Sequence, residues 1–135
     1  MARTALLGAV LLLAAIAGCT SGGEEDPGTA SPTPTGSGTL ADRACPTGSV
    51  LTYISFGSPF VSDNCTGCHS SALPAGTPRQ NAPIDVNFDT VDDVRAWKDR
   101  IYLRAADGYA TMPPAGGPSV TDRWRLGDWL ACGAP

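Results

Sequence analysis

Two cysteines and a histidine stand together near the middle of the chain, in the run Cys65-Thr66-Gly67-Cys68-His69. Thiols at this spacing can add to the two vinyl groups of one haem, and a histidine that follows directly can then bind the iron. The sequence contains one histidine, and it is this one. The motif therefore predicts that Cys65 and Cys68 hold a c-type haem through thioether bonds and that His69 is its proximal iron ligand.

The same pair of cysteines would suit three other kinds of site. A thioredoxin-like dithiol requires a preceding strand and a βαβ pattern, which the sequence does not indicate. A zinc site requires two more ligands at a second paired spacing, but Cys45 and Cys132 stand alone and far apart. A plain disulfide between Cys65 and Cys68 is the third alternative. The histidine directly after the pair favours haem over all three.

One methionine is a candidate for the opposite side of the iron. The sequence has two, Met1 and Met112, and we expect processing of the N-terminus to remove the first. The run Pro113-Pro114 restricts the backbone after Met112, so a stiff loop presents this side chain. An arbitrary methionine is more often a core or surface residue, but here it is the only thioether left in a protein without a second histidine. Met112 is the predicted distal ligand, and a His/Met pair is typical of an electron-transfer haem.

The first 18 residues have the composition of an export signal. Arg3 supplies a positive charge, and the apolar stretch 5–17 is too short and too rich in small residues for a comfortable membrane span. The stretch leads into Ile16-Ala17-Gly18-Cys19, which resembles a bacterial lipobox. In such signals cleavage falls before the cysteine and its thiol carries a diacylglycerol, so Cys19 is the predicted lipidation site. An ordinary signal peptide that happens to contain a cysteine is the alternative.

Composition divides the remaining chain into a tether and a head. Residues 19–44 are rich in Gly, Ser, Thr and Pro without apolar periodicity, so a flexible linker is expected after the lipidated cysteine. Residues 45–135 form the predicted haem domain, whose small size limits the core that side chains alone can build. The apolar ring of a covalently held haem would complete that core.

Cys45 and Cys132 remain once the other cysteines are assigned. Export implies an oxidising compartment, in which we expect these two to form a disulfide. That bond would close nearly the whole head and, in the chain-entropy model, contribute up to about 4–5 kcal/mol. Two free buried thiols are the alternative.

Helices are predicted on both sides of the haem motif. Ser58 is a plausible N-cap with Pro59 at the first helical position, which predicts a short helix that runs into the motif. Thr90 and Asp93 have the spacing of a capping box, which predicts a second helix that ends near Gly108.

A third helix is expected to begin near Ser119 or Thr121 and to end at Gly133. Its apolar stripe consists of Leu126, Trp129 and Leu130. Aromatic residues at helical spacing are usually core residues, so we expect the tryptophans to pack in the core and against the haem rather than to form a separate ligand site.

The order of these features resembles that of class I cytochromes c: a helix, C-x-x-C-H, a loop, a middle helix, M-P-P and a C-terminal helix. The whole chain is similar to a bacterial cytochrome c-type lipoprotein. The specific parts of the resemblance are Cys65, Cys68, His69 and Met112. It implies a small all-α fold of about three helices around one covalently bound haem c. Terminal helices cross in that family, often at a glycine, which Gly57 supplies here; the crossing would bring Cys45 and Cys132 close together.

The resemblance leaves the surroundings of the ligands open. A backbone carbonyl should accept the ring N–H of His69. The candidates for this carbonyl are Pro74, Pro78 and Pro83. Arg79 is a candidate partner for a haem propionate. Tyr102 or Tyr109 could donate to a propionate or to the sulfur of Met112.

The function implied is that of a one-electron carrier rather than an enzyme. It would be lipid-anchored to a bacterial membrane, with its haem domain in the periplasm or at the cell surface and redox proteins as donor and acceptor. Without Arg3, eight basic side chains stand against thirteen acidic ones, which disfavours nucleic acid and anionic partners.

Four alternatives to a simple electron carrier remain. A haem-based sensor of small ligands or redox state, and a haem subunit of a larger oxidoreductase, would use the same motif. A peroxidase would need a distal acid–base group, and the sequence offers no obvious one. The alternative without haem is a lipid-anchored structural domain stabilised by a disulfide.

Overall fold

The computed structural model of the chain describes residues 38–135. The chain contains three helices, namely α1 (Ser58–Asn64), α2 (Val91–Ala105) and α3 (Val120–Ala131), within the described residues. Three shorter turns accompany them, namely η1 (Leu40–Asp42), η2 (Tyr53–Gly57) and η3 (Thr77–Arg79). Of these, η1 and η3 are 3-10 turns and η2 is a π-helical turn. Residues 38–135 contain no strand, so the expected all-α class is confirmed. The predicted signal peptide, Cys19 and most of the predicted linker lie outside the described residues.

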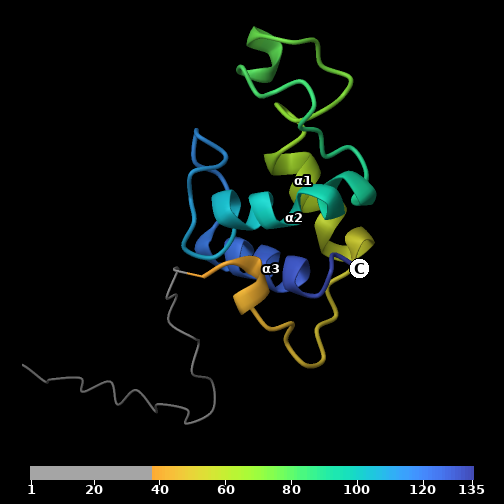
Figure 1. The fold of residues 1–135 in the computed structure, drawn as a ribbon, viewed down its shortest axis with the longest axis vertical. Helices are drawn as coiled ribbons and strands as arrows, with labels where there is room; N and C mark the ends of the chain where they lie inside the picture. Colours follow the sequence, from red (N-terminus) through yellow and green to blue (C-terminus); the bar gives the residue numbers. More distant parts are fainter. Residues whose placement is uncertain (1–37) are drawn as a thin grey trace, which may run out of the picture. The chain divides into compact units, whose positions relative to one another are not determined.

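The caps of α2 and α3 are those that the sequence indicated. Thr90 Oγ1 accepts from the N–H of Asp93 at 3.2 Å, and the Asp93 carboxylate accepts from the N–H of Thr90 at 3.0 Å. Ser119 Oγ accepts from the N–H of Asp122 at 3.1 Å, so Ser119 rather than Thr121 is the N-cap. Each cap satisfies a backbone donor that the first helical turn leaves without a partner. The two helices pack against each other (Figure 1).

The first helical segment, which consists of η2 and α1 together, begins earlier than predicted. Thr52, not Ser58, is the N-cap, and its Oγ1 accepts from the N–H of Ser55 at 3.1 Å. The turn η2 continues directly into α1, because Gly57 and Ser58 both have right-handed helical angles. In η2 the N–H groups of Gly57 and Ser58 donate to carbonyls five residues back. This wider turn accommodates Pro59, whose ring would collide with the preceding turn of a regular α-helix.

Trp129 of α3 lies at the centre of the core and is fully buried. Its ring meets Phe56 edge to face, with centroids 6.1 Å apart, and stacks with Tyr53 at 6.4 Å. Gly57 lies directly against this ring, since a Cβ built there would be 2.5 Å from Cη2 of Trp129. A residue without a side chain therefore lets the first helix approach α3 closely.

The packed domain begins before Cys45, the predicted start of the head. Leu40 of η1 is buried, and η1, orange in Figure 1, contacts α2 and α3. The carbonyl of Gly38 accepts a 3.0 Å hydrogen bond from the Tyr109 hydroxyl. The described residues before Cys45 therefore belong to the domain and not to the linker. Composition missed them because one buried leucine in a run of small and polar residues creates no periodic pattern.

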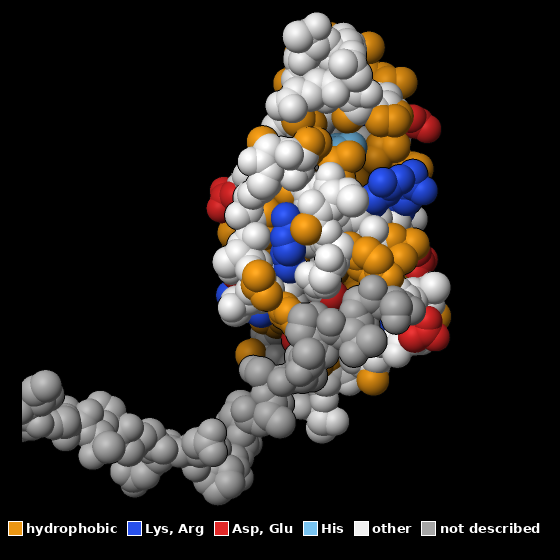
Figure 2. All heavy atoms as spheres, turned by 90° about the vertical axis from the view of Figure 1, so that its left-hand side faces the viewer, with side chains coloured by type: hydrophobic (Ala, Val, Ile, Leu, Met, Phe, Trp, Pro, Cys, Tyr) orange, Lys and Arg blue, Asp and Glu red, His pale blue; other side chains and the backbone are white. Residues whose placement is uncertain are grey.

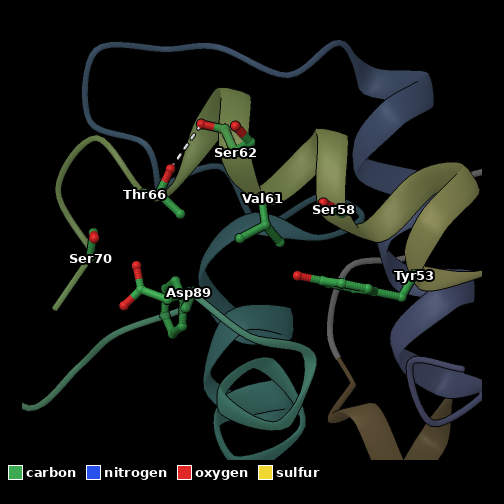
Figure 3. A pocket seen from close by; sticks show the side chains of 8 residues that line it. Tyr53, Ser58, Val61, Ser62, Thr66, Ser70 and Asp89 are labelled. Atoms are coloured by element: carbon green, nitrogen blue, oxygen red, sulfur yellow. Dashed lines mark hydrogen bonds between the residues drawn. The ribbon is translucent and has the colours of Figure 1, made fainter. Parts of the chain in front are cut away.

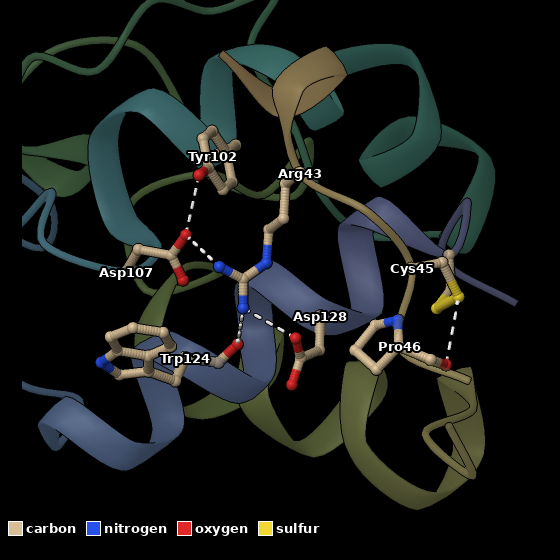
Figure 4. Close-up of polar contacts among 8 residues, drawn as sticks. Arg43, Cys45, Pro46, Tyr102, Asp107, Trp124 and Asp128 are labelled. Atoms are coloured by element: carbon tan, nitrogen blue, oxygen red, sulfur yellow. Dashed lines mark hydrogen bonds and ion pairs between the residues drawn. A yellow bond between two sulfur atoms is a disulfide. The ribbon is translucent and has the colours of Figure 1, made fainter. Parts of the chain in front are cut away.

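Arg43 ties this segment to the two long helices (Figure 4). Its Nη1 donates to the Asp107 carboxylate at 2.5 Å and its Nη2 to Asp128 at 2.7 Å. The guanidinium also lies 5.4 Å from the ring centre of Trp124. The Tyr102 hydroxyl donates to the same Asp107 oxygen at 2.7 Å. A half-buried cation thus joins the N-terminal segment, the turn after α2 and α3.

A disulfide joins Cys45 to Cys132, with their Cα atoms 4.7 Å apart. It links the segment before η2 to the residue that caps the C-terminal end of α3. Cys65 and Cys68 are the free thiols among the described cysteines. Within residues 38–135 no helix has the length and apolar character needed to cross a membrane.

Candidate functional site

The C-x-x-C-H segment forms a tight turn directly after α1. The N–H of Cys65 donates to the carbonyl of Val61 at 2.8 Å. The N–H groups of Cys68 and His69 then both donate to the carbonyl of Cys65, at 3.0 and 2.9 Å. One short stretch of backbone therefore carries two half-buried free thiols and the imidazole.

The Cys65 thiol is not activated for redox chemistry. Burial, followed by the charge on the neighbouring Cys68 sulfur, raises its pKa to about 12. A thioredoxin-like dithiol needs the opposite, a thiol at a helix N-terminus with a lowered pKa. Cys65 instead follows the C-terminal end of α1. These observations argue against the dithiol alternative.

The zinc alternative lacks ligands in the part of the chain that the structure describes. No group of three or more His, Cys, Asp or Glu side chains there could hold a metal ion. A four-coordinate zinc site at Cys65 and Cys68 would need two further ligands. The other two described cysteines are bonded to each other.

His69 makes three contacts with the segment 86–88. Its Nδ1 lies 3.0 Å from the carbonyl oxygen of Val86. Because a carbonyl can only accept, Nδ1 carries the proton of a neutral ring. The ring also stacks on Phe88 with centroids 4.8 Å apart, and the N–H of Phe88 donates to the His69 carbonyl at 2.9 Å. This arrangement fixes the ring and leaves the lone pair of Nε2 free to bind a metal.

The carbonyl that holds His69 therefore belongs to a residue that the sequence analysis did not consider. The residues considered were Pro74, Pro78 and Pro83. In the structure the chain turns after Pro83, and the N–H of Val86 donates to the Pro83 carbonyl at 3.1 Å. That turn brings the carbonyl of Val86, three residues further on, to the imidazole.

Arg79 is fully buried inside the same loop. Its Nη2 donates to the carbonyls of Pro83 at 2.8 Å and Val86 at 2.9 Å. Its Nε donates to Ala82 at 3.3 Å, and its Nη1 donates to the carbonyl of Ser70. The expected pairing of Arg79 with a haem propionate does not fit this geometry, because each nitrogen already faces the loop backbone.

Met112 lies in the loop between α2 and α3 and is held through its backbone. Its N–H donates to the carbonyl of Arg104 at 2.9 Å, and its own carbonyl accepts from Arg123 at 2.9 Å. The residue as a whole is 37% exposed and is therefore not part of the packed core. The peptide bond from Met112 to Pro113 is cis.

The Met112 loop lies beside the end of α1, next to the cysteine motif. A Cβ built at Gly117 would be 3.0 Å from Cγ of Pro113 and 3.4 Å from Oδ1 of Asn64. Pro113 follows Met112 and Asn64 precedes Cys65, so the two predicted ligand segments are neighbours. The loop that follows Met112 therefore lies against the residue that precedes the motif.

Two tyrosines that were considered as partners of the Met112 sulfur or of a propionate donate elsewhere. The Tyr102 hydroxyl donates to Asp107, and the Tyr109 hydroxyl donates to the carbonyl of Gly38. Both hydroxyls serve the packing of the N-terminal segment. The sequence could not reveal this, because their partners lie in the turn after α2 and in a segment assigned to the linker.

A polar cavity of about 320 Å³ lies next to the motif (Figure 3). Its lining consists of Tyr53, Ser58, Val61, Ser62, Thr66, Ser70, Phe88 and Asp89. The side chains of Cys65, Cys68 and His69 do not line it. Phe88 lines the cavity and also stacks on His69, so this ring lies between the two. The cavity is therefore a feature beside the candidate site and not the site itself.

The surface near the imidazole is apolar. Figure 2 shows hydrophobic side chains gathered around the pale blue side chain of the single histidine.

Comparison of the chain with protein-family models, with curated proteins and with solved structures found no match. The case for the site therefore depends on the residues and their geometry.

Sequence reasoning missed two residues that hold His69 and gave a third, Arg79, a different role. Val86 contributes a backbone carbonyl, which no residue type signals, and Phe88 is an ordinary apolar residue in the sequence. Arg79 did carry a signal, because it is the only charged residue in the stretch 70–84. A lone cation in a stretch of small residues and prolines is a candidate for burial against backbone carbonyls.

Proposed function

We propose that this chain is a membrane-anchored one-electron carrier with one covalent haem c and the fold of a class I cytochrome c. The observation that carries the proposal is the state of His69. Its Nδ1–H is bonded to Val86, its Nε2 is free, and it follows two unbridged thiols at the attachment spacing. A neutral histidine with one nitrogen hydrogen-bonded is the usual form of a metal ligand.

The described residues fit a covalently attached haem. Cys65 and Cys68 would hold it through thioethers, and His69 Nε2 and Met112 Sδ would bind its iron. When bound, the haem supplies an iron that accepts and returns one electron. The Met112 loop, which lies beside the segment that precedes Cys65, supports this assignment of the second ligand.

The chain itself contributes rigidity and a preference between oxidation states. Val86 and Phe88 fix the ring of His69, and backbone hydrogen bonds fix Met112. Ligands that stay in place between two oxidation states keep the reorganisation small. A thioether favours ferrous iron and raises the potential relative to a second histidine.

The proposal includes the N-terminal anchor. A lipid on Cys19 and the tether after it would keep the domain at the membrane, in the periplasm or at the cell surface, where redox proteins are its donor and acceptor. Incorporation of a labelled fatty acid into the wild-type chain, but not into Cys19→Ser, would support the anchor. Equal labelling of both chains would contradict it.

Optical spectra of the protein produced with a c-type maturation system test the proposal directly. We expect haem that stays attached on a denaturing gel and a ferric charge-transfer band typical of methionine–iron ligation. Covalent haem without that band, together with carbon monoxide binding to the native ferrous protein, would favour a sensor instead. A chain without covalent haem would overturn the proposal.

Substitution of the distal ligand gives a second test. Met112→His should keep the covalent haem and lower the reduction potential, because imidazole favours ferric iron more than a thioether does. A redox titration beside the wild-type protein measures the change. An unchanged potential would show that Met112 is not the ligand.

A further inference from the structure

The guanidinium of Arg79 and the imidazole of His69 share one hydrogen-bond acceptor. The carbonyl oxygen of Val86 lies 3.0 Å from Nδ1 of His69 and 2.9 Å from Nη2 of Arg79. The carbonyl thus accepts from both side chains through its two lone pairs. A change in the charge or position of this oxygen caused by Arg79 therefore also changes its hydrogen bond with His69.

Arg79 is buried without an acidic partner among the residues that the structure describes. The ion pairs recorded there involve Arg43, Arg95 and Arg125. Its charge is balanced instead by backbone carbonyls from both ends of the loop, from Ser70 to Val86. Hydrogen bonds from Ser70 and Ser71 and, to a smaller extent, the charge of Arg79 lower the pKa of the Asp89 carboxyl, but the described residues form no direct ion pair with Arg79. Burying a cation in this way is costly, and a neutral side chain could fill the same space. Filling space therefore does not by itself explain why a charged residue occupies this position.

We propose that Arg79 is a positioning residue that fixes and polarises the Val86 carbonyl, and that it thereby raises the reduction potential of the haem bound at His69. The inference rests on the proposed function and deepens it. It concerns the potential of the site, which the sequence motif alone does not set.

Two effects of Arg79 act in the same direction. A donor at 2.9 Å draws electron density from the Val86 oxygen, so the oxygen is a weaker acceptor for Nδ1–H and His69 is a less electron-rich ligand. The buried positive charge also disfavours the extra positive charge of ferric iron. Both effects favour the ferrous state.

The contact also fixes where the carbonyl lies. The backbone hydrogen bonds within the loop from Ser70 to Val86 close local turns between residues three to five positions apart, and none of them joins the two ends of the loop. Arg79 connects the two ends of this loop. Its removal would therefore release the carbonyl from the cation and loosen its position at the same time.

The test uses three variants of the haem-loaded protein. Arg79→Met removes the charge and all donors, and Arg79→Gln removes the charge but keeps an amide NH2 group that can donate. Arg100→Met is the matched control, because Arg100 is an exposed arginine of α2. For Arg79→Met we expect the ferric-to-ferrous ratio at a fixed ambient potential to rise on the order of tenfold relative to Arg100→Met. For Arg79→Gln we expect a smaller rise.

A spectroscopic measurement distinguishes tuning from damage to the loop. In the ferrous protein the Nδ1 proton resonance of His69 should move downfield in both Arg79 variants, because the released carbonyl is a stronger acceptor. The methionine–iron band should persist. If the Arg79 variants keep this band but show the same ferric-to-ferrous ratio as Arg100→Met, the inference is overturned.

Failure of both Arg79 variants to keep six-coordinate haem would also overturn it, since Arg79 would then serve only to build the loop. A wild-type chain that takes up no covalent haem would instead overturn the proposed function. The two failures are therefore distinguishable.

Discussion

At the scale of single residues, the buried carboxylate of Asp107 accepts hydrogen bonds through one oxygen, while its other oxygen has no hydrogen-bond partner among the described residues. Asp107 accepts from Arg43 and from the Tyr102 hydroxyl. Burial, followed by the hydrogen bond to Asp107 and the charge of that carboxylate, raises the pKa of Tyr102 to about 12. The phenol is therefore a neutral donor throughout the physiological range.

This shift gives a prediction about alkaline stability. The pKa of Tyr102 is about 12 in the folded chain against 10.0 for an ordinary tyrosine, so only the folded state keeps the proton between these values. Its stabilising contribution is present below pH 10 and is lost as the pH rises through 12. The difference in ultraviolet titration between wild type and Tyr102→Phe should show one phenol that ionises near pH 12. Ionisation of that phenol near pH 10 would contradict the hydrogen bond.

At the scale of elements, the close approach of the first helix to α3 depends on the glycine at their crossing. Gly57→Ala would place a methyl group against the buried ring of Trp129. The two backbones must then separate, and we expect a loss of about 1–3 kcal/mol in the free energy of unfolding. Urea denaturation followed by circular dichroism measures this loss.

Gly67→Ala is the control for this substitution, because a Cβ at Gly67 meets nothing within 4 Å. Its free energy of unfolding should lie within about 0.5 kcal/mol of the wild-type value. Equal effects of the two substitutions would show that the contact with Trp129 does not limit the approach of the helices.

At the scale of the whole domain, the N-terminal segment and the end of α3 are joined twice. The Cys45–Cys132 disulfide spans 87 residues of sequence, and Arg43 pairs with Asp107 and Asp128 close to it. The disulfide limits the freedom of the unfolded chain, whereas the ion pairs act only in the folded state. The domain should therefore lose stability, but not its fold, when the disulfide is removed.

The double substitution Cys45→Ser/Cys132→Ser should lower the free energy of unfolding by up to about 4–5 kcal/mol in the chain-entropy model. Denaturation of the haem-loaded protein with and without the substitution tests this. The non-reduced mass of the wild-type protein is the control. A mass about two units above that of the bridged chain would show two free thiols and contradict the Cys45–Cys132 disulfide.

Much of the local structure could be predicted because the signals lie within a few residues of one another. Thr90 was recognised as a cap in this way, and Ser119 was one of two candidates for the cap of α3, since a cap binds a backbone donor two or three positions ahead. The C-x-x-C-H motif is local for the same reason. The first helix was placed too late, because Pro59 indicated a helix start and nothing in the sequence indicated the wide turn before it.

From the sequence alone we could derive the helical class, the start of α2, two candidate starts for α3 and the groups that could bind a haem. The tertiary structure decided how those groups are held. The carbonyl of Val86, the burial of Arg79 and the docking of Arg43 on residues 64 and 85 positions away depend on where the backbone turns. A backbone carbonyl is the same for every residue type, and a distant partner leaves no mark on neighbouring positions, so neither can be found before the chain has folded.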